Sequence, residues 1–132
     1  SVYSRVAALE RKIEIVSVSY KIQPEKKAPK IKLDKEYINL GKRKNGIPIE
    51  VKFSITNEGN APLIIFGIEG SCSCTVVKND ETPLLSGESR IIKAAINTEQ
   101  LFGKLTKTVT IKSNAIPKDK TVIINFEIIK NN

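Results

Sequence analysis

Apolar and polar residues alternate one by one along much of the chain. The clearest alternation covers residues 49–56, where Ile49, Val51, Phe53 and Ile55 are each followed by a polar or charged residue. A period of two places the apolar side chains on one face of a β-strand. The same period recurs in residues 90–97, 105–112 and 122–128. These segments predict half-buried strands with a shared core made of Val51, Phe53, Ile55, Ile92, Ile96, Val109, Ile111, Val122, Ile124 and Phe126.

Shorter segments complete the pattern. Residues 30–34, 37–40 and 74–78 are brief alternations, and residues 63–68 are a nearly continuous apolar run. Such a run predicts a strand that is covered on both sides. Turn-forming residues separate the segments about every ten residues, which is typical of a sandwich, and no helical pattern lies between them. The sequence therefore predicts an all-β, seven-stranded antiparallel immunoglobulin-like β-sandwich in a domain of residues 29–132.

The first 28 residues follow a different pattern and are expected to form an N-terminal extension. Val2, Val6, Leu9 and Ile13 are spaced by four and three residues, which predicts a short helix over residues 2–13. Alternation over residues 14–22 predicts a strand, and two prolines in residues 23–30 predict a linker. An apolar stripe on so small a domain needs cover, so residues 1–22 are expected to pack on the sandwich or to mediate self-association.

The composition excludes several kinds of chemistry. The 132 residues include no His, so the usual general base and the commonest metal ligand are both absent. The sequence contains no Ser-x-x-Lys or Gly-x-Ser-x-Gly motif and no glycine-rich phosphate loop. We therefore predict no enzymatic activity, no catalytic residues, no metal site and no cofactor.

The formal net charge of +8 comes from lysines and arginines spread along the whole chain. Local runs occur at Lys26, Lys27, Lys30, Lys32 and Lys35, and at Lys42, Arg43 and Lys44. These runs predict a solvated surface that also discourages pairing of exposed sheet edges. An anionic cell-surface polymer is the alternative partner. Nucleic acid is disfavoured, because the three Tyr and four Phe do not interleave with the basic runs.

Three stretches together resemble a known family. They are residues 53–63, the Gly-Ser-Cys-Ser-Cys-Thr element at 70–75, and residues 86–88 followed by Gly103, 107–109 and 113–114. In this order they resemble the bacterial domain-of-unknown-function family 1573, which is similar to Hydin-type and major-sperm-protein-like immunoglobulin folds. The resemblance implies an exported protein, often a lipoprotein of Bacteroidetes, without an assigned activity. Where the family pattern has Gly between the cysteines this chain has Ser73, so the turn geometry is expected to differ if that Gly adopts positive φ.

Cys72 and Cys74 are the candidate thiol pair. In an extended strand their Cα atoms would lie about 6.6 Å apart, whereas a disulfide prefers about 5.5–6 Å. Three interpretations stay open: two unlinked structural cysteines, a strained local disulfide that relaxes if residues 70–71 kink the chain, or a site for copper(I) or redox chemistry. Zinc is disfavoured because a structural site needs four ligands. A three-residue loop removes little unfolded-state entropy, so we expect the fold to persist without the pair.

Asn57 and Gly59 are the second pair of candidate residues, and we expect them to form the turn after the strand at residues 49–56. The chain contains no Met, which favours a processed precursor with its signal peptide removed. The predicted function is that of a non-catalytic module exported to the bacterial periplasm or cell surface. It would present loops or a sheet edge to a protein or a cell-surface polymer. The alternative is a thiol-redox or copper-binding envelope protein that uses Cys72 and Cys74.

Overall fold

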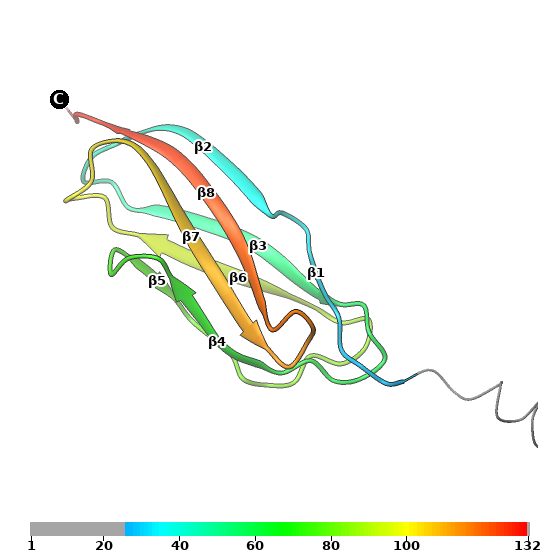
Figure 1. Ribbon diagram of the computed structural model, residues 1–132. Coiled ribbons are helices and arrows are strands. Elements are labelled where there is room, and N and C mark those ends of the chain that lie inside the picture. Colours follow the sequence, from blue (N-terminus) through cyan, green and yellow to red (C-terminus); the bar gives the residue numbers. More distant parts are fainter. Residues whose placement is uncertain (1–25, 132) are drawn as a thin grey trace, which may run out of the picture.

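The computed structural model describes residues 26–131, and these residues form two four-stranded sheets packed face to face (Figure 1). Sheet A has the order β1 (Ile31–Leu33), β3 (Ile49–Asn57), β6 (Ser89–Ile96), β5 (Thr75–Val77). Sheet B has the order β2 (Tyr37–Lys44), β8 (Asp119–Ile129), β7 (Gly103–Ser113), β4 (Ile65–Gly70). The predicted immunoglobulin-like sandwich is confirmed.

The core lies between the two sheets and follows the alternation in the sequence. All ten residues predicted for the core are buried, and Phe53 at the centre of β3 is only 2% exposed. Burying a side chain of this size stabilises the fold by about 1.5–3 kcal/mol relative to leaving it in water. The alternating burial along β3, β6, β7 and β8 thus explains why these four strands were recognisable from sequence.

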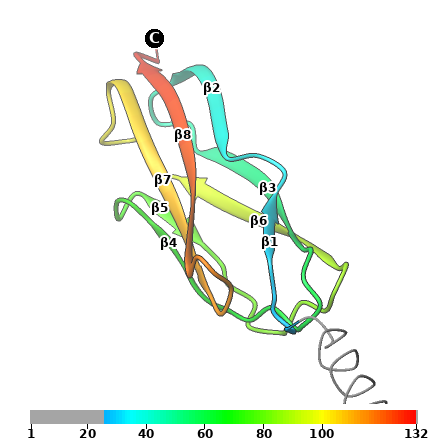
Figure 2. The same cartoon turned by 45° about the vertical axis from the view of Figure 1, so that its right-hand side comes forward.

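Two details of the predicted topology are wrong. The described residues form eight strands rather than seven, since each of the short segments at residues 30–34 and 37–40 contributes a strand of its own, β1 to sheet A and β2 to sheet B. Residues 34–36 carry the chain from sheet A to sheet B without a hairpin, so β1 and β2 follow each other along the same side (Figures 1 and 2). As a result β2 pairs with β8 in parallel, and the sandwich is not wholly antiparallel.

The apolar run at residues 63–68 is also not covered on both sides. Leu63 and Ile65 are fully buried, but Phe66 is 60% exposed. The run lies mostly in β4, which is an edge strand of sheet B, and no described element covers the outer face of that sheet. The run therefore contributes one face to the core, as the other strands do.

The predicted helix at residues 2–13 and strand at residues 14–22 lie outside the described residues. Residues 26–30 have no regular secondary structure. The division of the chain at residue 29 therefore stays a prediction. Within the described range, no helix is long and apolar enough to cross a membrane.

Candidate binding sites

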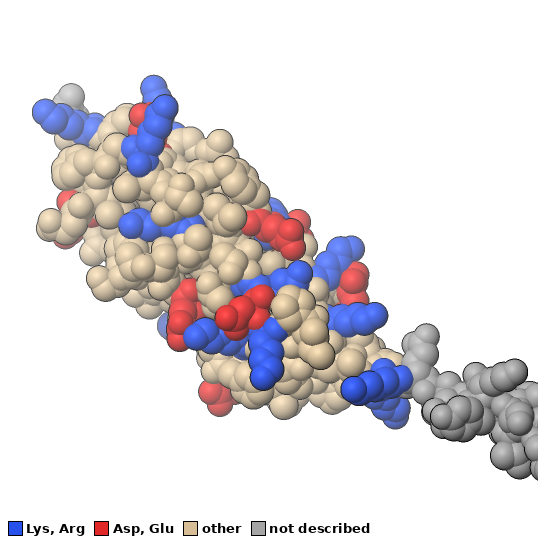
Figure 3. Space-filling view, in the orientation of Figure 1, with Lys and Arg blue, Asp and Glu red and all other residues tan. Residues whose placement is uncertain are grey.

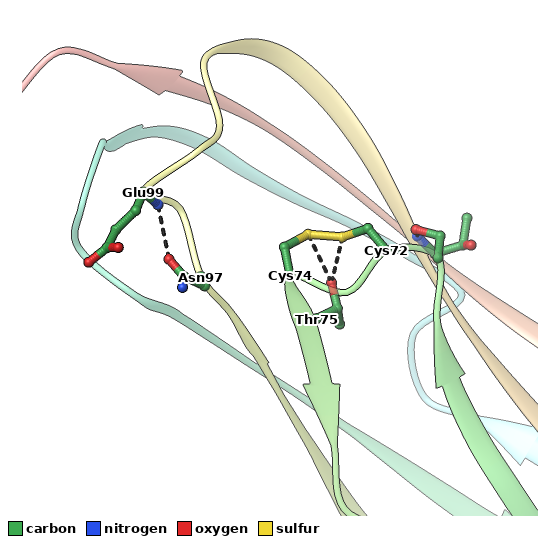
Figure 4. The surroundings of a disulfide bond; sticks show 7 residues. Cys72, Cys74, Thr75, Asn97 and Glu99 are labelled. Carbon is green, nitrogen blue, oxygen red and sulfur yellow. Dashed lines mark hydrogen bonds between the residues drawn. A yellow bond between two sulfur atoms is a disulfide. The ribbon is translucent and has the colours of Figure 1, made fainter.

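The two cysteines lie in the tight turn that joins β4 to β5 (Figure 4). Their sulfur atoms form a disulfide, and their Cα atoms are 5.2 Å apart. This distance is shorter than the 6.6 Å or so expected for a regular strand, so it is the turn that brings the sulfurs within bonding reach. The Thr75 hydroxyl lies 3.5 Å from the Cys72 sulfur and 3.8 Å from the Cys74 sulfur. Among the interpretations left open by the sequence, the structure therefore contains the linked pair.

Ser73 fits this turn without backbone strain. Among the described residues no residue other than glycine has a positive φ, so a Gly is not required between the cysteines. The described residues also contain no group of three or more His, Cys, Asp or Glu side chains that could hold a metal ion. With both sulfurs in a disulfide, copper(I) binding to thiolates would first require reduction of the bond.

Asn57 is a structural hub rather than a simple turn residue. Its side chain is fully buried at the end of β3. The Asn57 Oδ1 atom accepts hydrogen bonds from the backbone N–H groups of Gly59 (2.9 Å) and Lys30 (3.3 Å). Its Nδ2 group donates to the carbonyls of Ala61 (2.8 Å) and Leu84 (2.9 Å). One side chain thus connects three loops at this end of the sandwich, and both of its polar atoms are fully used in these structural bonds.

Gly59 is needed for close approach and not for positive φ. Its φ is not in the left-handed region, but a Cβ atom there would lie 2.6 Å from the Lys30 nitrogen and 2.7 Å from the Pro29 carbonyl carbon. The incoming chain at residues 28–30 therefore passes directly against the backbone of residue 59. Asn57 and Gly59 together hold the start of β1 in place.

The chain leaves sheet A soon after the disulfide. β5 pairs with β6 only opposite residues 94–96, and the chain then crosses towards sheet B. Asn79 Nδ2 donates to the Ile65 carbonyl (3.1 Å), and Leu84 forms an antiparallel bridge with Leu63. The Arg90 guanidinium donates to the carbonyls of Asp80 (2.8 Å) and Thr82 (2.5 Å). These bonds fix the path of the segment that follows β5.

This crossing leaves part of the β6 edge open. The Asn97 N–H donates to the Cys74 carbonyl (2.8 Å), so the backbone groups of odd-numbered residues on this strand point towards β5. By the alternation of an antiparallel ladder, the N–H and C=O groups of Ile91 and Lys93 point the same way. β5 ends at Val77, opposite Ala94, and no strand among residues 26–131 pairs with Ile91 or Lys93 on that side.

A groove of about 400 Å³ lies beside this open edge. It is lined by Lys78, Asn79, Asp80, Arg90, Ile91, Ile92 and Lys93. The Ile91 side chain points to the outer face of sheet A and is 66% exposed. Hydrogen bonds from the backbone N–H and the hydroxyl of Thr82, aided by the charge of Arg90, hold the pKa of the Asp80 carboxyl below its usual value.

The opposite edge of sheet A is chemically different. The Asp34 side chain accepts a hydrogen bond from the Ser54 N–H at 2.7 Å, so this backbone donor on the β3 edge already has a partner. Beyond that point the outward residues of β3 are Glu50 and Lys52, which lie 3.5 Å apart as an ion pair. Charged side chains are a common protection of sheet edges, whereas the β6 edge carries an exposed isoleucine. The β6 edge is thus the less protected of the two.

The positive charge is dispersed over the surface. In the face shown in Figure 3, lysine and arginine side chains are separated by neutral surface and by acidic groups. The residues of the two basic runs are exposed, as expected for a solvated surface. Ile91 and Lys93 were not among the residues predicted to form a site. The one signal for this edge in the sequence is Ile91, a large apolar residue that shares a face of the strand with Lys93 and Asn97.

The sandwich is similar to several solved structures of the immunoglobulin type. A protein of unknown function from Porphyromonas gingivalis W83 matches with a TM-score of 0.69 and 15% identity, over 82% of this chain and 50% of that chain. PapD-like domain 7 of human CEP192 matches with a TM-score of 0.64 and 9% identity, over 84% and 94%. The VesB protease of Vibrio cholerae matches with a TM-score of 0.57 and 20% identity, over 74% and 31%. Two of these three chains are thus much longer than the part that matches, and at these identities the likeness shows the fold alone.

The fold is therefore a β-sandwich of the immunoglobulin type, similar to that of a PapD-like domain. The model of the family described as "Protein of unknown function (DUF1573)" matches residues 31–128, and the chain belongs to this family. The resemblance seen in the sequence is confirmed. No curated protein matches the chain.

Proposed function

We propose that this chain is a non-catalytic, exported binding module that captures an extended segment of another protein at the open edge of β6. The observation that carries this proposal is the pair of outward-pointing backbone groups at Ile91 and Lys93. An extended peptide supplies the complementary N–H and C=O groups and adds a strand to the sheet. The added strand would continue the line of β5 along β6.

The side chains around the edge indicate what kind of segment fits. Lys93 lies directly opposite Lys52 on the outer face of sheet A, and Lys78 lines the groove. Asp80 is the single acidic residue of the groove lining. A captured strand with an apolar residue against Ile91 and an acidic residue near Lys93 would match this surface.

Other observations support the non-catalytic and exported parts of the proposal. The groove lining includes no Ser, Thr, Cys or His that could serve as a nucleophile or base. The Cys72–Cys74 disulfide is consistent with an oxidising compartment, where such bonds form and persist. No specific feature of the described residues favours the thiol-redox or copper-binding alternative over this proposal.

The test uses a display library of random ten-residue peptides selected against the full chain. Lys93→Pro removes the open N–H of β6, and Lys52→Pro is the matched control because Lys52 is its cross-strand partner on the other edge. We expect selected peptides to lose at least about tenfold in affinity for the Lys93→Pro chain and to bind the Lys52→Pro chain normally. Melting curves check that both variants are folded.

A second variant keeps the test interpretable if proline disturbs the strand. Ile91→Lys leaves the backbone intact but replaces the exposed apolar side chain with a charge, and it should also weaken binding. Failure to select any binder, or binding that neither the Lys93 nor the Ile91 substitution weakens, would refute capture at the β6 edge.

A further inference from the structure

A second surface, on the outer face of sheet B, carries polar side chains in register across three strands. Glu127 lies between Lys42 and Lys104, and two residues along β8 Asn125 lies between Asn39 and Thr106. The inward residues Ile124, Phe126 and Ile128 alternate with these on β8 and are buried. The two rows therefore share the outer face, since cross-strand neighbours project to the same side.

A β-bulge hollows this face. The register of β2 against β8 shifts between Asn39 and Lys42, and Gly41 in the bulge has a φ of 67°. Nothing lies within 4 Å of the position that a Cβ of Gly41 would take, so the missing side chain leaves open space. The resulting pocket has a volume of about 420 Å³ and includes both polar rows in its lining.

The amide at the centre of the pocket is held in place by its neighbours. The Thr106 hydroxyl donates to Asn125 Oδ1 at 2.5 Å, and Asn125 Nδ2 donates to the Tyr37 hydroxyl. Asn125 keeps one N–H and one acceptor lone pair for a ligand. The Tyr37 side chain is 63% exposed, so its ring lies next to the polar rows as an accessible aromatic surface. A preorganised amide beside an exposed ring suits a ligand that has both polar groups and a flat apolar face.

The charges in the pocket indicate what else the ligand carries. No carboxylate among the described residues lies within ion-pair distance of the ammonium group of Lys42 or Lys104. Both are available to an anion, with which they would form charge-assisted hydrogen bonds. Glu127 between them disfavours a compact, highly charged anion, but it can accept hydrogen bonds from hydroxyl groups. An anion that also carries several hydroxyls meets all of these requirements.

We infer that this face of sheet B binds an acidic oligosaccharide, with uronate carboxylates at Lys42 and Lys104 and sugar hydroxyls at Asn125 and Glu127. A pyranose ring would pack on Tyr37. This site lies on sheet B, whereas the β6 edge belongs to sheet A, so the inference does not depend on the proposed peptide capture.

The test measures binding by titration calorimetry with tetragalacturonic acid and, as the neutral counterpart, maltotetraose. The double variant Lys42→Gln, Lys104→Gln should weaken tetragalacturonate binding at least tenfold. The control double variant Lys52→Gln, Lys93→Gln removes the same charge from sheet A and should change the affinity less than twofold. Tyr37→Ala should weaken binding at least fivefold, whereas Tyr37→Phe should retain most of it.

Three results would overturn the inference. The first is no binding of tetragalacturonate at millimolar concentration. The second is an equal loss of affinity in the two lysine double variants, which would mean attraction to net charge only. The third is that maltotetraose binds as tightly as tetragalacturonate, which would show that the lysines do not recognise the carboxylates of the ligand.

Discussion

Replacing Asn57 with alanine should be among the most damaging polar substitutions in this protein. The side chain is fully buried and makes four hydrogen bonds, all to backbone groups, of 2.8 to 3.3 Å. Each such bond contributes about 1 kcal/mol net, and a buried partner left unpaired costs about 1–3 kcal/mol. Water can reach the partners in the part-buried loops, so we expect a loss of about 3–4 kcal/mol. That is a large fraction of the 5–15 kcal/mol that is typical of a small domain.

Asn60→Ala is the matched control for this substitution. The Asn60 side chain lies in the same turn but accepts one exposed hydrogen bond, from the Ala28 N–H at 2.7 Å. Its removal should cost less than about 1 kcal/mol. Urea unfolding followed by circular dichroism gives both free energies of unfolding. If the Asn57→Ala and Asn60→Ala variants lose the same small amount, the reasoning that Asn57 is the hub of this end of the sandwich is wrong.

Four further predictions follow from the core, the turns and the disulfide. Phe53→Ala should cost about 3–5 kcal/mol in urea unfolding, and a cost below 1 kcal/mol would mean that its face of β3 is not central. Replacing Cys72 and Cys74 together with Ser should leave a folded chain destabilised by at most about 2 kcal/mol, because the closed loop is so short; a variant without a cooperative melt would contradict this. Gly59→Ala should lower the melting temperature more than Gly67→Ala, since a Cβ at position 67 meets no atom within 4 Å and neither glycine has a positive φ; equal melting temperatures would contradict the close approach. The pKa of Asp80 is lower in the folded chain than in the unfolded chain, so its ionised carboxyl stabilises the fold above pH of about 4, and this contribution is lost as pH falls through the folded pKa. An NMR titration of Asp80 should therefore give a midpoint below 3.8. A midpoint at or above that value would contradict the Thr82 hydrogen bonds.

The sequence was informative wherever one face of a strand is buried. On β3, β6, β7 and β8 the apolar residues face a single core, so a period of two reports directly on the fold. The same reasoning failed for Phe66, because an apolar run does not show whether a second layer covers the outer face. It also failed for β2, whose parallel pairing with β8 depends on the path of residues 34–36 and not on local alternation.

The candidate sites were harder to predict than the fold. The disulfide depends on a turn of the backbone at residues 71–74, which the alternation pattern does not encode. The open edge of β6 depends on where the chain leaves sheet A, which is after Val77 opposite Ala94, and bonds from Asn79 and Arg90 hold the segment that follows. Asn57 and Gly59 lie at the end of β3, where the sequence predicted a turn. The glycine is required there because the backbone of residues 28–30 packs against it, and not because its φ is positive.

The central claim is that the β6 edge is open at Ile91 and Lys93, and amide hydrogen exchange measured by NMR tests it most directly. In the free protein the N–H groups of Ile92 and Ala94 point to β3 and should be protected, whereas those of Ile91 and Lys93 should exchange at least about a hundredfold faster after correction for intrinsic rates. A selected peptide bound at this edge should slow the exchange of Ile91 and Lys93. Equal protection of all four amide groups in the free protein would show that the edge is already closed and would contradict the account.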